Sequence, residues 1–237
     1  MRLVRAANLV PGFLKPVLRP LYRLLVSRRP AERPKVSWQE KRLSGTLQRW
    51  HIISGSIDVT DRTLLDVGCN AGILSSLAAD HGLSVVGVDV NPSSIQYAIS
   101  RSKGQPRLAF MLMDIEPSTI SHIPVFDVVL CLSVHHQWVS RYGPDIADCM
   151  LKEIGCHALS KFYFEPASLA VKYGAHAPPI IDNDEETIVE YNNNLLRSVF
   201  GEGCSVKCLG KTECSSKEPF RLLFLVEKNS GKADGAQ

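Results

Sequence analysis

The sequence predicts an α/β fold built on a doubly wound sheet, mostly parallel, with a C-terminal antiparallel hairpin. Between Arg62 and Glu165, short apolar runs typical of buried strands alternate with helix-like segments, which is the pattern of a parallel sheet covered on both faces. Two later strand-like runs are joined by the polar turn CSSKEP, which indicates an antiparallel edge on a mixed sheet. The composition, 45% hydrophobic and 22% charged, is ordinary for a globular domain.

The predicted elements follow in a regular order. A helix with Ser37 as its N-cap is expected within residues 37–61, ahead of the sheet. The expected strands are Thr63–Val67, Ser84–Val88, Leu108–Leu112, Val125–Leu132, Ser160–Glu165, Ser205–Glu213 and Phe220–Glu227. The expected helices are Gly72–Asp80, Pro92–Ser102, Asp145–Ile154 and Glu185–Phe200.

The charge is concentrated near the N-terminus. Eleven of the 27 Lys and Arg but only two of the 24 Asp and Glu lie between Met1 and Arg42, so this part carries +9 and the rest −6. We therefore expect a basic amphipathic N-terminal arm at residues 1–36, a folded domain at 37–228 and a disordered tail at 229–237. Three interpretations of the arm stay open: contact with an anionic membrane surface, contact with RNA phosphates, or packing on the domain itself.

Seven cysteines, an odd number, several of them in apolar runs, favour free thiols and a reducing, cytoplasmic compartment. No uncharged apolar run is long enough for a transmembrane helix, and no secretory signal is expected. The basic arm leaves room for membrane association. The spacing of Cys204, Cys208 and Cys214 matches no standard zinc site, and no metal is predicted.

The stretch LLDVGCNAGILSSLAADHGLSVVGVDVN, residues 64–91, carries the first functional signal. A strand that enters a glycine-rich turn at a helix N-terminus brings backbone N–H groups close to a ligand, and Gly68 and Gly72 keep that approach clear of side chains. Asp89, at the end of the next strand, is placed to accept both hydroxyls of a ribose. The loop lacks the dinucleotide pattern G-x-G-x-x-G, and the Asp66 carboxylate would repel a pyrophosphate. A nucleoside with a cationic amine fits better.

Four stretches in order, LLDVGCNAG, VVGVDVN, MLMDIE and FDVVLCLSVHHQW, resemble the successive motifs of the class I S-adenosylmethionine-dependent methyltransferases. The resemblance spans Arg62 to the C-terminus, and it implies a Rossmann-like fold with S-adenosylmethionine as cofactor. One departure is Asn70, where many members have Gly or Thr. Asn is tolerable there because it adopts left-handed backbone conformations more readily than most residues.

The resemblance also implies a cofactor site, residue by residue. Contacts are expected from Asp66, Gly68, Cys69, Asn70 and Gly72 around the methionine end, from Asp89 at the ribose, from Val90, Asp114 and Ile115 at the adenine, and from Leu132 and Ser133 beside the methyl group. Two alternatives remain at this stage. The glycines could form a tight turn with no ligand, and Asp114 could cap a helix.

His135, His136 and Glu165 are the predicted catalytic residues. The two histidines follow a predicted strand, and Glu165 ends the next one, at the edge of the sheet where this fold opens its acceptor pocket. Methyl transfer is a direct displacement that needs alignment, and it needs a base only when the acceptor must lose a proton. The alternative is that one histidine is a packed or capping ring and the other is exposed.

Three functions stay open from the sequence. The first is a methyltransferase acting on a small-molecule or lipid- or glycan-linked acceptor, which suits the acidic body. The second is an RNA methyltransferase acting on a phosphate, ribose or base of a small RNA. It rests on the basic arm and on a loose resemblance of LCLSVHHQWV and FYFEPAS to the RNA phosphate-capping methyltransferases. The third is a catalytically silent binding protein. The methyl acceptor, its reacting atom, the use of a metal, the oligomeric state and the role of the arm are left open.

Overall fold

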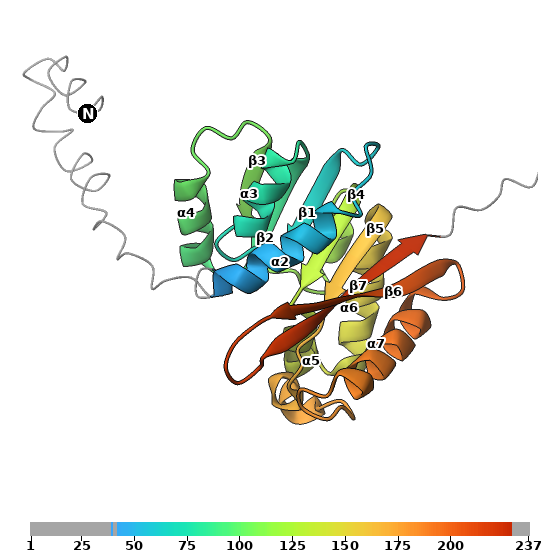
Figure 1. Ribbon diagram of the computed structural model, residues 1–237. Coiled ribbons are helices and arrows are strands. Elements are labelled where there is room, and N and C mark those ends of the chain that lie inside the picture. The colour runs from blue at the N-terminus through green and yellow to red at the C-terminus, as the bar shows by residue number, and fades with distance from the viewer. Residues whose placement is uncertain (1–38, 40–41, 229–237) are drawn as a thin grey trace, which may run out of the picture. The chain divides into compact units, whose positions relative to one another are not determined.

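The computed structural model describes Gln39 and residues 42–228. Their seven strands form one sheet in the order β3-β2-β1-β4-β5-β7-β6 (Figure 1). Strands β1 to β5 pair in parallel, whereas β7 is antiparallel to both β5 and β6. The predicted fold class is therefore confirmed, hairpin included. The arm at residues 1–36, the cap at Ser37 and the tail at 229–237 lie outside the described residues, and the predictions made for them stay predictions.

The strands lie within two residues of their predicted positions. Their bounds are β1 Thr63–Val67, β2 Ser84–Asp89, β3 Leu108–Leu112, β4 Phe126–Leu132, β5 Ala158–Glu165, β6 Cys204–Glu213 and β7 Phe220–Lys228.

The helices follow the prediction except at one place. Their bounds are α2 Leu43–Ser54, α3 Ile73–Asp80, α4 Pro92–Arg101, α5 His135–Tyr142, α6 Pro144–Cys156 and α7 Glu185–Phe200, with short 3₁₀ segments η4 Ile120–His122 and η5 Ala170–His176. Helix α5 was not predicted, because no side chain caps its N-terminus and the sequence therefore lacks a helix-start signal there. None of the helices in the described part combines the length and apolar composition needed to cross a membrane.

The side chains of β4 illustrate how the sheet is covered on both faces. Val128 and Leu130 belong to an apolar cluster shared with α2 and α3, while Val129 and Cys131 belong to a cluster shared with α5, α6 and α7. This alternation is the period-2 pattern of a strand. Because both faces are buried, the strand reads in the sequence as one continuous apolar run.

The order of the strands indicates that the functional edge of the sheet is the one formed by the carboxyl ends of its parallel strands. Strand β1 pairs with β2 on one side and with β4 on the other, so the direction of winding reverses there. In such sheets ligands bind at the carboxyl ends of the strands, beside this switch point. Phe164 of β5 pairs with Phe224 of the antiparallel β7. The start of β7 therefore lies at the same edge, and Arg221 comes next to the carboxyl end of β5.

Helix α2 packs against the hairpin formed by β6 and β7. A Cβ atom at Gly45 would overlap the backbone carbonyl of Glu213, so only glycine permits this approach. The Gln48 side chain accepts a hydrogen bond of 2.8 Å from the Glu213 N–H, and Arg42 Nε donates one of 3.0 Å to the Cys214 carbonyl. These contacts bring α2 to the functional edge.

Candidate active site

A cavity of about 590 Å³ opens at the carboxyl ends of the parallel strands, a volume typical of small-molecule sites. Its walls come from the ends of β1, β2 and β4, from the segment after β3, and from α2, α5, η5 and β7. The predicted site residues that line it are Gly68, Asn70, Asp89, Val90, Asp114, Ile115, Leu132, Ser133 and His136.

The turn after β1 adopts left-handed backbone at two lining residues. Gly68 has a φ of 71° and Asn70 a φ of 51°. A Cβ at Gly68 would come within 2.6 Å of the Val134 side chain, so this position requires glycine. Asn70 takes the conformation that its residue type tolerates best after glycine, as the sequence suggested.

Asp89 joins this turn to the end of β2. Its Oδ2 accepts a 2.8 Å hydrogen bond from the Asn70 N–H, and its Oδ1 accepts one of 2.8 Å from the Asn91 N–H. The carboxylate is thus held rigidly at the cavity wall. Because each carboxylate oxygen has a second lone pair, both can still accept a hydroxyl.

Asp114 and Ile115 follow β3 and line the same side of the cavity. Arg141 of α5 donates a 2.8 Å hydrogen bond from Nη1 to Asp114 Oδ2. Among the described helices, none is capped by the Asp114 side chain, and Thr119 is the residue that precedes η4. The capping alternative for Asp114 is therefore excluded.

Three predicted cofactor residues shape the turn without lining the cavity, which differs from the predicted direct contact. Asp66 is 2% exposed, and its Oδ2 accepts a 2.6 Å hydrogen bond from the Ser75 hydroxyl. Cys69 is fully buried, and its backbone bonds to Val88 and Gly72. Gly72 has a φ of 69°, and a Cβ there would overlap the Phe110 ring. Of the three, Gly72 is the position at which the turn requires its residue type.

Known proteins match this part of the chain in sequence. A family model described as a methyltransferase domain matches residues 65–157. The ubiquinone biosynthesis O-methyltransferase of Psychrobacter arcticus is 28% identical over 104 residues, covering 42% of this chain and 40% of its own. A Coxiella burnetii protein of the same name is 33% identical over 87 residues, covering 36% and 37%. The chain thus spans less than half the length of these curated relatives.

Solved structures match over more of the chain. WbdD, described as a bifunctional kinase-methyltransferase, superposes with a TM-score of 0.58 at 21% identity, over 86% of this chain and 46% of its own. Magnesium protoporphyrin IX methyltransferase from Synechocystis PCC 6803, solved with bound S-adenosylmethionine, gives a TM-score of 0.54 at 15% identity, over 94% and 96%. At these identities the likeness is one of fold.

Residues 65–157 thus match a methyltransferase domain, and the described residues share the fold of a methyltransferase solved with S-adenosylmethionine. The predicted family, its Rossmann-like fold and its cofactor are thereby confirmed. The cavity of the methyltransferase domain also fits the cofactor. Gly68 leaves room for close approach, Asp89 suits a ribose, and Asn70 Oδ1 is a buried acceptor with no hydrogen-bond partner in the described structure. Such an oxygen suits the ammonium of a methionine moiety.

The two histidines of α5 have different surroundings. His135 is 1% exposed, contacts Phe164, and lies 2.9 Å through Nε2 from Asp148 Oδ1. It does not line the cavity, so its position is that of a packed ring, in contrast to the predicted catalytic role. His136 lines the cavity and contacts Tyr173 edge-on.

Glu165 is fully buried at the end of β5 and does not line the cavity. Its Oε2 lies 3.0 Å from Arg49 Nε, and its Oε1 lies 3.5 Å from Arg221 Nη1 and accepts a 2.5 Å hydrogen bond from the Ser133 hydroxyl. Both arginines line the cavity. Glu165 is thus a positioning residue for two cations, in contrast to the predicted direct catalytic role.

Sequence reasoning missed the cationic side chains of the site. The cavity is also lined by Arg42, Arg49, Lys172 and Arg221. One usable signal was present, because Arg42, Thr46 and Arg49 follow the i, i+4, i+7 spacing of a single helical face, and all three line the cavity.

Burial raises the pKa of Asp66 to about 7, and the nearby charge of Asp89 adds to this rise, against the Ser75 hydrogen bond. In the unfolded chain the value is near 3.8. The folded state therefore keeps a proton that the unfolded state releases. Stability from this group is full below pH 3.8 and is lost as the pH rises through about 7.

Asp66→Asn should remove the loss of stability at high pH, because the amide carries no charge, and it keeps a polar partner for the Ser75 hydroxyl. We expect the variant to exceed the wild type in free energy of unfolding at pH 8, by at most about 4 kcal/mol, and the gap to close toward pH 4. Urea unfolding between pH 4 and 8 measures both.

The matched control is Asp127→Asn. Hydrogen bonds from the Arg62 and Thr63 backbone and the Thr63 hydroxyl outweigh partial burial and lower the pKa of Asp127. This variant should therefore lose stability at pH 8. Lower stability of Asp66→Asn at pH 8 would contradict the account of Asp66.

Proposed function

We propose that this protein transfers a methyl group from S-adenosylmethionine to an oxygen of a small molecule, free or linked to a lipid or glycan. The observation that carries the proposal is a single cavity that joins the Asp89 carboxylate at one end to the His136 imidazole at the other. The names of the relatives support it, since they refer to ubiquinone biosynthesis and to magnesium protoporphyrin IX, both of which are small molecules.

The cofactor is proposed to lie along the ends of β1, β2 and β3. Asp89 would accept the ribose hydroxyls, and Asp114 and Ile115 would flank the adenine. Arg49 suits the methionine carboxylate, because its buried side chain lines the cavity and its Nε makes no hydrogen bond within the described structure. A planar guanidinium binds carboxylates in bidentate fashion. When bound, S-adenosylmethionine supplies a methyl group activated by a sulfonium.

His136 is the proposed base. Burial lowers the pKa of His136 to about 3, and the charges of Arg221 and Lys172 lower it further, so the ring is neutral at physiological pH. Its Nδ1 is buried without a hydrogen-bond partner in the described structure. A neutral imidazole at the cavity wall has a nitrogen lone pair that can take the proton of an acceptor hydroxyl as its oxygen bonds to the methyl carbon. A pKa this low makes it a weak base until the nearby positive charges are offset.

The RNA alternative gains no support from these relatives, none of which is named for RNA. The basic arm on which it rests lies outside the described residues. The catalytically silent alternative makes a different prediction, namely cofactor binding without transfer to any acceptor.

Asp89→Ala should abolish cofactor binding. The change removes the ribose acceptor and releases the Asn70 and Asn91 N–H groups that hold the loop. Hydrogen bonds to a charged group contribute about 1.5–3 kcal/mol each, so affinity should fall by about 100-fold or more. Calorimetric titration with S-adenosylmethionine and S-adenosylhomocysteine measures it.

Asp145→Ala is the matched control, because Asp145 is an exposed aspartate of α6 that does not line the cavity. It should bind both ligands like the wild type. An unchanged dissociation constant in Asp89→Ala, or no binding by the wild type, would contradict the proposed cofactor site.

His136→Gln should lower kcat by roughly 100-fold and leave the affinity for S-adenosylhomocysteine unchanged. The reason is that the base is lost while the cofactor wall stays intact. Transfer of labelled methyl from S-adenosylmethionine to a panel of phenols, hydroxy acids and sugar phosphates would be measured, with the exposed His122→Gln as control. Equal rates in wild type and His136→Gln would remove His136 from the mechanism.

A further inference from the structure

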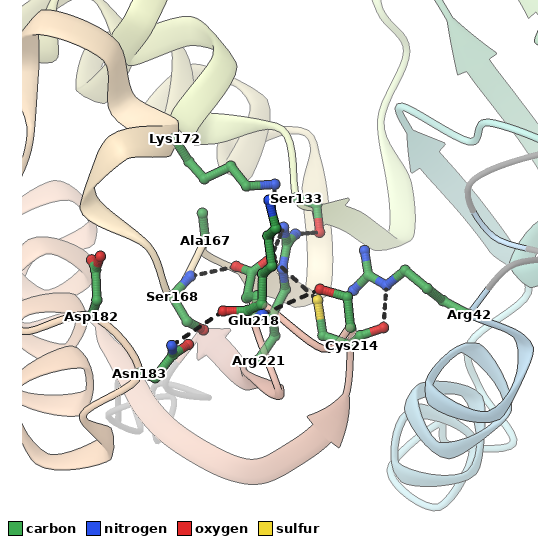
Figure 2. Close-up of polar contacts among 12 residues, drawn as sticks. Arg42, Ser133, Ala167, Ser168, Lys172, Asp182, Asn183, Cys214, Glu218 and Arg221 are labelled. Carbon is green, nitrogen blue, oxygen red and sulfur yellow. Dashed lines mark hydrogen bonds and ion pairs between the residues drawn. The ribbon is translucent and has the colours of Figure 1, made fainter.

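The end of the cavity formed by β4, η5 and β7 is cationic. Arg221, 1% exposed, contacts the Ser133 hydroxyl through Nη1 and donates a 2.9 Å hydrogen bond from Nη2 to Glu218 Oε2 (Figure 2). Lys172 Nζ lies 3.8 Å from the same Glu218 oxygen. Both cations line the cavity. The hairpin and η5 therefore present two positive groups to whatever binds there.

The carboxylates that accompany these cations lie behind them. Glu165 and Glu218 are 0% and 1% exposed, and neither lines the cavity. Glu218 also accepts hydrogen bonds from the Ser168 N–H at 2.8 Å and the Cys214 thiol at 3.2 Å (Figure 2). Its oxygens are thus held by protein groups. Among the described residues at this end, Arg221 and Lys172 line the cavity and the two carboxylates that accompany them do not.

Two buried nitrogens at this end have no hydrogen bond within the described structure. They are Arg221 Nε and His136 Nδ1, on side chains that both line the cavity. A buried polar group without a partner costs stability. The oxygen atoms of an acidic ligand are the natural partners of the guanidinium, which only donates.

The cofactor does not account for these cations. Asp89 ends β2, whereas Arg221 lies in β7, four strands along the sheet, or roughly 19 Å at the usual spacing of about 4.8 Å. This is the distance between the two backbones; the Arg221 guanidinium reaches Ser133, directly after β4, which is two strands from β2. The methionine moiety carries a single carboxylate, which the proposed function assigns to Arg49, so Arg221 and Lys172 are left for another anion.

We infer that Arg221 and Lys172 bind an anionic group of the methyl acceptor, a carboxylate or a phosphate. The inference rests on the proposed function, since it names the chemical class of acceptor for the same site. Charge-assisted hydrogen bonds to a guanidinium and an ammonium give both affinity and orientation. A bound anion also offsets the positive charges beside His136, which raises the pKa of His136 and makes it a better base.

The test uses the full chain saturated with S-adenosylhomocysteine. Benzoate, phenyl phosphate and benzamide are titrated in turn, benzamide being the neutral match for benzoate. We expect at least one of the anions to bind at least about tenfold more tightly than benzamide. Tighter binding of benzoate would indicate an acceptor with a carboxylate, and tighter binding of phenyl phosphate an acceptor with a phosphate.

Lys172→Gln should weaken binding of the preferred anion by about tenfold, and Lys172→Arg should retain most of it. Both variants should bind S-adenosylhomocysteine like the wild type, which shows that they are folded. Equal binding of benzamide and the anions, or unchanged anion affinity in Lys172→Gln, would overturn the inference alone. Failure of the wild type to bind S-adenosylhomocysteine would instead overturn the proposed function.

Discussion

The buried carboxylate of Glu165 is the interaction on which the site depends. It stands at the end of β5, fully excluded from solvent, between Arg49 of α2 and Arg221 of β7. A buried charge is tolerated only when it is paired and hydrogen-bonded. The Ser133 hydroxyl completes the set. One residue therefore fixes two cations from opposite ends of the chain at the same wall of the cavity.

The rest of the site follows from the order of the strands. The turn after β1 and the end of β2 form one end of the cavity, with Asp89 as its acceptor of hydrogen bonds. The start of the antiparallel β7 forms the other end, where Glu218 holds Arg221. Helix α2 spans both, because Gly45 lets it lie directly on the β6 backbone. A polar cofactor end and a cationic acceptor end thus share one cavity.

The sequence was sufficient for the features that depend on local patterns, including the strands, the left-handed Asn70 and the position of Asp89. It could not show that Arg221 meets Glu165, since they lie 56 residues apart and are joined by an antiparallel strand. Neighbouring helical residues point about 100° apart. Helix α5 therefore turns His135 into the core and His136 toward the cavity. The sequence could not separate the two, because no side chain caps the start of α5 and the helix was not predicted.

The most direct measurement is a crystal structure of the full chain with S-adenosylhomocysteine. The account predicts that the ribose lies on Asp89, that the methionine carboxylate contacts Arg49, and that the Arg221 and Lys172 side chains stay clear of the ligand. A methionine carboxylate bound by Arg221 and Lys172 would contradict the division of the cavity into a cofactor end and an acceptor end. The cations would then serve the cofactor, and the acceptor would need no negative charge.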